Sequence, residues 1–120
     1  MKKKTLVLGA STNPERYSFM AIRKLKFAGH PVVAVGLREG EVCGVVIEKP
    51  FPRFEEVHTV TLYIGPRNLP VYHDYIRSLK PKRVIFNPGT ESPEFAGILA
   101  AEGIEVVHGC TLIMVSSEQY

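Results

Sequence analysis

The sequence predicts a single α/β domain over residues 1–120, with a mainly parallel sheet. Short apolar segments alternate with segments of helical periodicity along the chain. This alternation is typical of strands that are buried beneath helices on both faces of a sheet. Because crossover connections are right-handed, one main topology remains, a Rossmann-like three-layer arrangement with a five-stranded, mainly parallel sheet.

Five apolar segments are predicted to be the strands of this sheet. They are Thr5–Gly9, Pro31–Val35, Val60–Ile64, Arg83–Phe86 and Ile104–Val107. Each ends at, or within two residues of, a glycine or an asparagine, residue types that favour turns. Between Leu37 and Pro52 no helical period is sustained, so we expect a loop around a small strand, Val45–Ile47.

The first helix is predicted to run to Ala28, and its start has two alternatives. Thr12 and Glu15 have the spacing of a capping box, which starts the helix early. Ser18 instead fits the cap of a shorter helix, which leaves residues 13–17 as a loop. The longer loop is the form more useful for binding a ligand.

Two further helices and a terminal element follow. One helix is expected from about Leu69 to Leu79, and another after a Ser92 cap, ending before Gly103. The segment Leu112–Val115 is expected to be a terminal turn or a short helix.

Composition excludes several classes of protein. No apolar run approaches the roughly 20 residues of a membrane helix, so no membrane contact is expected. The basic residues Lys2–Lys4 resemble the start of a signal peptide, but the apolar run of Thr5–Ala10 is too short for one. We therefore expect a cytoplasmic protein. Cys43 and Cys110 lack the spacing of a disulfide framework or a zinc site, and no metal is expected.

Charge is unevenly distributed along the chain. Residues 1–30 carry +6 and residues 31–120 carry −3. Aromatic residues do not interleave with the basic cluster, so we interpret it as a solvated face and expect no nucleic-acid partner.

The turn after the first strand is the candidate ligand site. A strand, a tight polar turn and the start of a helix present unpaired backbone N–H groups, which together bind anions. The candidate residues of this turn are Gly9, Ala10, Ser11, Thr12, Asn13, Arg16, Tyr17 and Ser18. The short polar side chains and the Arg16 charge suit a pyrophosphate, although simple helix capping remains a compatible alternative.

The type of nucleotide follows from two departures from the dinucleotide pattern. After Gly9, the later glycine positions of Gly-x-Gly-x-x-Gly hold Ser11 and Pro14, which disfavours an ordinary nicotinamide dinucleotide. NAD sites have an acidic residue at the tip of the second strand, where this chain has Gly36-Leu37-Arg38. Arg38 suits an extra phosphate on the ribose, as in NADP or coenzyme A (CoA), while a solvated charge pair with Glu39 remains the alternative.

The motifs of this chain resemble the CoA-binding domain family of small Rossmann-fold proteins, over almost the full length. That family is related to the N-terminal domain of the succinyl-CoA synthetase alpha subunit. The landmarks are Val7-Leu8-Gly9-Ala10-Ser11, Arg16-Tyr17-Ser18, Gly29-His30-Pro31-Val32, Gly44, Asn87-Pro88-Gly89 and Gly103-Ile104-x-Val106-Val107-x-Gly109-Cys110. Two positions depart from the family pattern: Gly36-Leu37 stands where Asn-Pro is frequent, and Asn87 where Gln is frequent.

The resemblance implies a CoA or acyl-CoA site at the carboxyl ends of the strands. It implies that the Gly9–Ser18 turn holds the pyrophosphate and the Gly36–Arg38 tip holds the adenosine. It also implies that Ile64, Gly65 and Pro66 border the adenine or pantetheine, and that Asn87, Pro88 and Gly89 line the arm. Cys110 follows the fifth strand, where a pantetheine thiol can arrive, and a mixed disulfide with CoA is one hypothesis for it.

No catalytic constellation is recognisable. His30, His58, His73 and His108 are scattered, and none pairs with a nucleophile in a known motif. The expected function is therefore a stand-alone CoA-binding protein without catalytic activity, with a protein partner or a homo-oligomer left open. The alternatives are a small NADP-dependent reductase or other nucleotide-using enzyme, and an interaction protein with a decayed nucleotide site.

Overall fold

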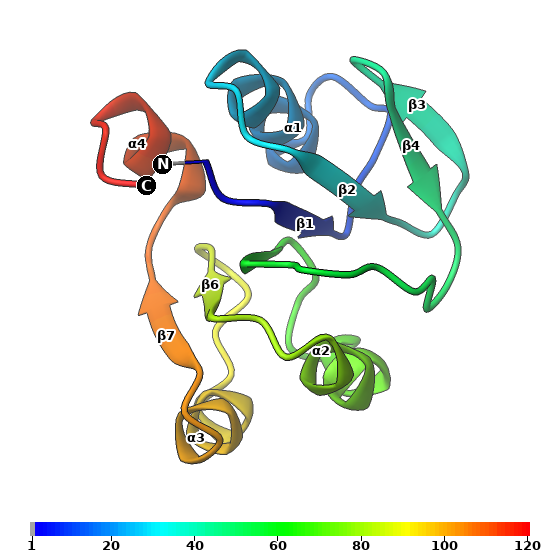
Figure 1. The fold of residues 1–120 in the computed structure, drawn as a ribbon. Helices are drawn as coiled ribbons and strands as arrows, with labels where there is room; N and C mark the ends of the chain where they lie inside the picture. The colour runs from blue at the N-terminus through cyan, green and yellow to red at the C-terminus, as the bar shows by residue number, and fades with distance from the viewer. Residues whose placement is uncertain (1) are drawn as a thin grey trace.

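One sheet organises the chain in the computed structural model, which describes residues 2–120 (Figure 1). The sheet has seven strands in the order β3-β4-β2-β1-β5-β6-β7. The strands are β1 (Thr5–Leu8), β2 (Val32–Val35), β3 (Gly40–Val42), β4 (Val45–Glu48), β5 (Thr59–Leu62), β6 (Arg83–Phe86) and β7 (Glu105–His108). All neighbouring pairs are parallel except β3 and β4. The α/β class with a mainly parallel sheet is confirmed.

Helices cover both faces of the sheet, which makes the three predicted layers (Figure 1). They are α1 (Tyr17–Phe27), the 3-10 helix η1 (Leu69–Tyr72), α2 (His73–Leu79), α3 (Pro93–Ala101) and α4 (Thr111–Ser116). On one face Ile22 of α1 and Met114 of α4 pack with Val7 of β1. On the other face Ile76 of α2 and Phe95 of α3 belong to the larger core cluster. Successive residues of β1 point into opposite clusters, because side chains alternate along a strand.

The direction of winding reverses at β1. The chain leaves β1 through α1 to pair β2 on one side, and β5 later pairs with β1 on the other side. In such sheets the usual ligand position is at the carboxyl ends of the strands beside this reversal, here β1 and β5. The amino ends lie at the opposite edge. There Lys2 Nζ donates to the Ala28 carbonyl at the end of α1 at 2.5 Å, so the basic N-terminus lies away from the carboxyl ends of the strands.

The prediction of five strands was wrong, because the segment expected to be a loop contains a hairpin. The expected small strand is present as β4, which pairs β2 in parallel, and β3 pairs β4 in antiparallel fashion. The hairpin turns at Cys43 and Gly44, both with positive φ, 50° and 81°. This is the geometry of a two-residue turn of the kind that Asn-Gly usually forms. β3 was missed because it has three residues and because cysteine rarely adopts positive φ.

The start of α1 corrects both predicted caps. Helix α1 begins at Tyr17 with Arg16 as its N-cap, so residues 13–16 form a loop, as in the shorter-helix alternative. Ser18 lies inside the first turn and is buried, so it is not the cap. The Thr12–Glu15 capping box does not form. By contrast, the predicted Ser92 cap is confirmed, since its Oγ accepts from the Phe95 N–H at 3.3 Å.

Candidate functional site

The turn after β1 is fixed by close backbone approaches. Gly9 has φ of +98°, and a Cβ at this position would lie 2.8 Å from the Tyr63 carbonyl oxygen. The N–H groups of Gly9 and Ala10 both donate to the Val35 carbonyl, at 2.8 and 2.9 Å. Only glycine satisfies both the left-handed backbone and the contact with Tyr63, which explains the residue at this position.

Polar side chains of the turn bond to its own backbone. Ser11 Oγ accepts from the Asn13 N–H, and Asn13 Oδ1 accepts from the Glu15 N–H, both at 3.0 Å. The Asn13 carbonyl also accepts from the Arg16 N–H at 3.0 Å. These local bonds shape residues 11–16 into a loop with exposed Thr12, Asn13 and Arg16 side chains.

The start of α1 is electropositive. Its N-cap residue Arg16 makes no side-chain hydrogen bond to the first turn, and that turn contains no acidic residue. The first N–H groups of the eleven-residue helix are the positive end of its dipole. Arg16 adds a full charge at the same place, and Tyr17 is 69% exposed beside it. The arrangement is suited to an anion such as a pyrophosphate.

The tip of β2 lies directly against this turn. A Cβ on Gly36 would stand 2.3 Å from the Ala10 carbonyl oxygen, so glycine permits the contact. A Cβ on Gly40, at the start of β3, would stand 2.5 Å from Thr12 Cγ2. The hairpin that sequence reasoning missed therefore borders the loop. Leu37 is 86% exposed, and Arg38 is exposed at the same corner.

The ends of β5 and β6 lie at the same edge of the sheet. Ile64 is half-buried, and its Cγ1 would lie 3.0 Å from a Cβ on Gly9, so it lines the first turn. Gly65 and Pro66 follow and are exposed, as are Pro88 and Gly89 after β6. The structure thus brings all the predicted segments to one edge of the sheet.

Asn87 is a buried structural residue at this edge. Its Nδ2 donates to Thr61 Oγ1 at 2.7 Å and to the Leu62 carbonyl at 2.8 Å. Its Oδ1 accepts from the Thr111 N–H at 2.9 Å, and the side chain is 3% exposed. Because these bonds use both amide hydrogens and the oxygen, Asn87 ties β5, β6 and α4 together. Thr61 and Thr111 also bond each other, at 2.7 Å.

Cys110 and Tyr63 flank this network. Cys110 is a free, half-buried thiol at the N-cap of α4, next to the Thr111 N–H that Asn87 holds. Burial raises the pKa of Tyr63 to about 12. Its buried hydroxyl has no hydrogen-bond partner within residues 2–120. Sequence reasoning missed Tyr63 because it placed this residue inside a strand, whereas β5 ends one residue earlier.

The histidines make local contacts outside any nucleophilic arrangement. His30 Nδ1 accepts from the Lys3 N–H at 3.0 Å, and His58 Nδ1 lies 2.7 Å from Thr59 Oγ1. His73 stacks on a phenylalanine ring at 3.8 Å, and His108 stacks on another at 5.2 Å. Burial is the main cause that lowers the pKa of His30, His58 and His73.

Residues 2–120 offer neither a cluster of metal ligands nor a membrane-spanning helix. Residues 2–120 contain no group of three His, Cys, Asp or Glu side chains placed to hold a metal ion. No helix among these residues has the length and apolar character required to cross a bilayer.

The fold defines a Rossmann-like α/β protein with a polar turn after β1. The chain belongs to the CoA binding domain family, whose model matches residues 3–116. A comparison with curated proteins gave no match.

Solved structures with the same fold are known. An uncharacterized protein of known crystal structure is 51% identical, with a TM-score of 0.97, and the match covers 100% of this chain and 99% of that one. The protein cell-free ID.343 from Thermus thermophilus is 26% identical, with a TM-score of 0.86, covering 99% of this chain and 91% of that one. A dinucleotide-forming acetyl-coenzyme A synthetase from Ca. Korarchaeum cryptofilum shares the fold at 16% identity. Its TM-score is 0.71, and the match covers 89% of this chain and 25% of that one.

Proposed function

We propose that residues 1–120 form one stand-alone unit that binds CoA or an acyl-CoA and has no catalytic activity of its own. The observation that carries this proposal is the uncapped, acid-free start of α1 behind the Gly9 turn, in a chain of the CoA binding domain family. The helix start offers N–H donors and positive potential to a pyrophosphate. Arg16 provides a charge-assisted hydrogen bond to the same group.

The adenosine end of the ligand is assigned to the tip of β2. Gly36 lets this tip approach the turn, and exposed Leu37 provides an apolar surface for a base. Arg38 is exposed and has no acidic partner within salt-bridge distance among residues 2–120, so its guanidinium is available to the ribose phosphate. The residue directly after β2 is Gly36, whereas sites that select the unphosphorylated ribose of NAD have an acidic residue there. The nearest carboxylates are Glu39, after Arg38, and Glu48, in register with Val35 at the end of β4.

The pantetheine arm is assigned to the ends of β5 and β6. Ile64, Gly65 and Pro66 form one wall, and Pro88 and Gly89 form the other. Asn87 acts here as a positioning residue, because its side-chain amide is fully engaged within the protein. This assignment places the thiol end of the ligand near Cys110. The Cys110 thiolate can then attack the disulfide form of CoA, giving a mixed disulfide and releasing one CoA thiol, which intact mass with and without reductant detects.

A calorimetric panel of CoA, dephospho-CoA, acetyl-CoA, NADP and NAD tests the function. We expect CoA to bind, and removal of the ribose phosphate to weaken binding by about tenfold or more, equivalent to ~1.4 kcal/mol. NADP binding without CoA binding would instead indicate the reductase alternative. If none of the five compounds binds, the result would favour an interaction protein whose nucleotide site has decayed.

Absence of catalysis is tested separately. Acetyl-CoA incubated with the protein should release free thiol no faster than acetyl-CoA alone. Release that depends on protein concentration and saturates with substrate would contradict the non-catalytic part of the proposal and leave the binding part intact.

A further inference from the structure

A second surface of the molecule lies along α1 and α4, away from the strand ends. We call it the α1–α4 surface and define it by the side chains that it exposes or that line its cavity. These are Met20, Lys24 and Phe27 of α1, Leu112, Ile113 and Ser116 of α4, and Ser117. Phe27 is 97% exposed and Ile113 is 67% exposed. Met20, Lys24 and Phe27 have the i, i+4, i+7 spacing that places side chains on one face of a helix.

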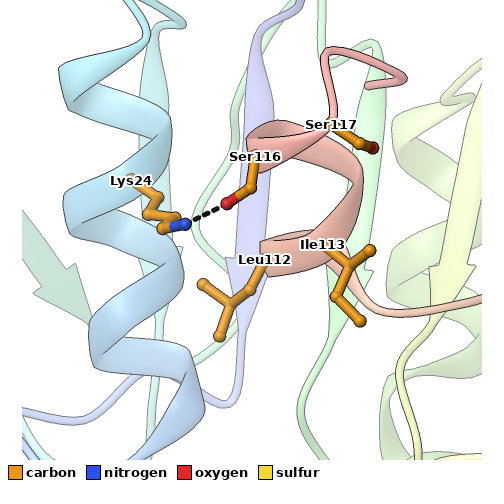
Figure 2. Close-up of a pocket in the computed structure, with 5 residues that line it drawn as sticks. All are labelled: Lys24, Leu112, Ile113, Ser116 and Ser117. Carbon is orange, nitrogen blue, oxygen red and sulfur yellow. Dashed lines mark hydrogen bonds between the residues drawn. The ribbon is translucent and has the colours of Figure 1, made fainter.

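A cavity of about 320 Å³ opens between the two helices on this surface. It is lined by Leu112, Ile113, Ser116 and Ser117 on one side and by Lys24 on the other (Figure 2). Lys24 Nζ donates to Ser116 Oγ across it (Figure 2). No acidic side chain within residues 2–120 lies within salt-bridge distance of Lys24. An ammonium beside an apolar cavity thus has a neutral hydroxyl as its side-chain partner.

The charge carried by the two helices has one sign. Helix α1 carries Arg23, Lys24 and Lys26 and no acidic residue, and Arg16 stands at its start. Helix α4 has the sequence TLIMVS and carries no charge. The cations of α1 all lack a salt-bridge partner in the described chain. The surface therefore combines exposed apolar groups with unpaired positive charge, and it is complementary to a ligand with the opposite charge.

We propose that the α1–α4 surface docks an acidic segment of a protein partner. One large apolar side chain of that segment enters the cavity between Leu112 and Ile113, and a neighbouring carboxylate pairs with Lys24. Phe27 extends the apolar contact by one turn. Aromatic and apolar anchors next to a desolvated ion pair are the usual centre of a protein interface.

The charge pattern argues against the other occupants. A second copy of the chain, packed through this face, would bring two sets of α1 cations together, and like charges opposed across an interface are destabilising. A nucleic-acid phosphate backbone would satisfy the charge, but it offers no apolar partner to the exposed Phe27 and Ile113 side chains. A peptide segment satisfies both features.

Selection of peptides tests the proposal. The full chain is used to select from a displayed library of random helix-length peptides, and the enriched peptides are measured by fluorescence anisotropy. We expect them to place Asp or Glu beside Leu, Ile or Phe, and to lose binding by about tenfold or more on Phe27→Ser and on Lys24→Glu. Replacing the peptide carboxylate by lysine should restore binding to the Lys24→Glu variant. Val71→Ser is the control. It removes an apolar side chain that is 67% exposed on η1, away from the α1–α4 surface, and this variant should bind the peptides like the wild type.

Four outcomes would overturn the proposal. In the selection, they are the enrichment of no peptide, or enriched peptides that bind the Phe27→Ser and Lys24→Glu variants like the wild type. In sedimentation, it is a dimer of the chain that Phe27→Ser abolishes. In flotation, it is binding to anionic vesicles that Phe27→Ser abolishes. Phe27 and Lys24 are exposed, and Lys24 makes only one side-chain hydrogen bond, to Ser116, so their replacement should lower the melting temperature little. CoA affinity measured on the same variants should also be unchanged, which separates this surface from the proposed CoA site.

Discussion

Replacing Asn87 by alanine tests what holds the ends of β5 and β6 to the start of α4. The change removes three buried side-chain hydrogen bonds, to Thr61 Oγ1, to the Leu62 carbonyl and from the Thr111 N–H, with lengths of 2.7 to 2.9 Å. A neutral hydrogen bond contributes about 1 kcal/mol net, and a buried donor left unpaired adds 1–3 kcal/mol, so we expect a loss of about 3–5 kcal/mol. This is a large share of the stability of a small domain. Urea unfolding, followed by circular dichroism, measures it as a lower transition midpoint.

Thr90→Val is the matched control for Asn87→Ala. Thr90 Oγ1 donates to the Asn87 carbonyl at 2.7 Å, but the Thr90 N–H donates to the same oxygen at 3.0 Å and remains. Valine keeps the shape, so the control should lose only about 1 kcal/mol. Equal losses in the two variants, or a loss below about 1 kcal/mol for Asn87→Ala, would refute the positioning role of the amide.

Three further predictions concern the turn, the pH dependence and the ribose phosphate. Gly36→Ala places a Cβ 2.3 Å from the Ala10 carbonyl oxygen; it should lower stability by about 1–3 kcal/mol and weaken CoA binding, and unchanged unfolding would contradict the close approach. Burial, with nearby lysines, lowers the pKa of folded His30 below its unfolded value of 6.5. The contribution of His30 to the free energy of unfolding is therefore complete above pH 6.5, and it is lost as the pH falls through the folded pKa. His30→Gln should therefore flatten the fall in unfolding free energy between about pH 7 and pH 5, and an unchanged slope would exclude this residue as a cause. Finally, Arg38→Ala should bind CoA and dephospho-CoA equally, whereas a retained preference for CoA would assign the ribose phosphate to another group.

Features of the fold with local causes could be predicted from the sequence. The Gly9 turn follows from an apolar run that stops at a glycine, and the Ser92 cap follows from its position before a proline. The two ends of β6 were predicted to the residue. Each signal is contained within a few consecutive residues, so no tertiary information was needed.

Other features depend on contacts between distant segments and could not be predicted. The structural role of Asn87 arises from partners about 25 residues away on either side, in β5 and at the start of α4. The hairpin β3–β4 turns through Cys43, whose positive φ is imposed by the pairing of the flanking strands. Burial of the Tyr63 hydroxyl likewise depends on where β5 ends and on how α4 packs.

The proposed location of the ligand is tested most directly by NMR. Backbone amide shifts of the full chain are recorded while CoA is added. We predict that the largest changes fall on residues 9–18, with a second group at residues 36–38 and a third at residues 64–66 and 88–89. Largest changes along the exposed face of α1 and α4, or no change at saturating CoA, would contradict the assignment of the pyrophosphate to the turn after β1.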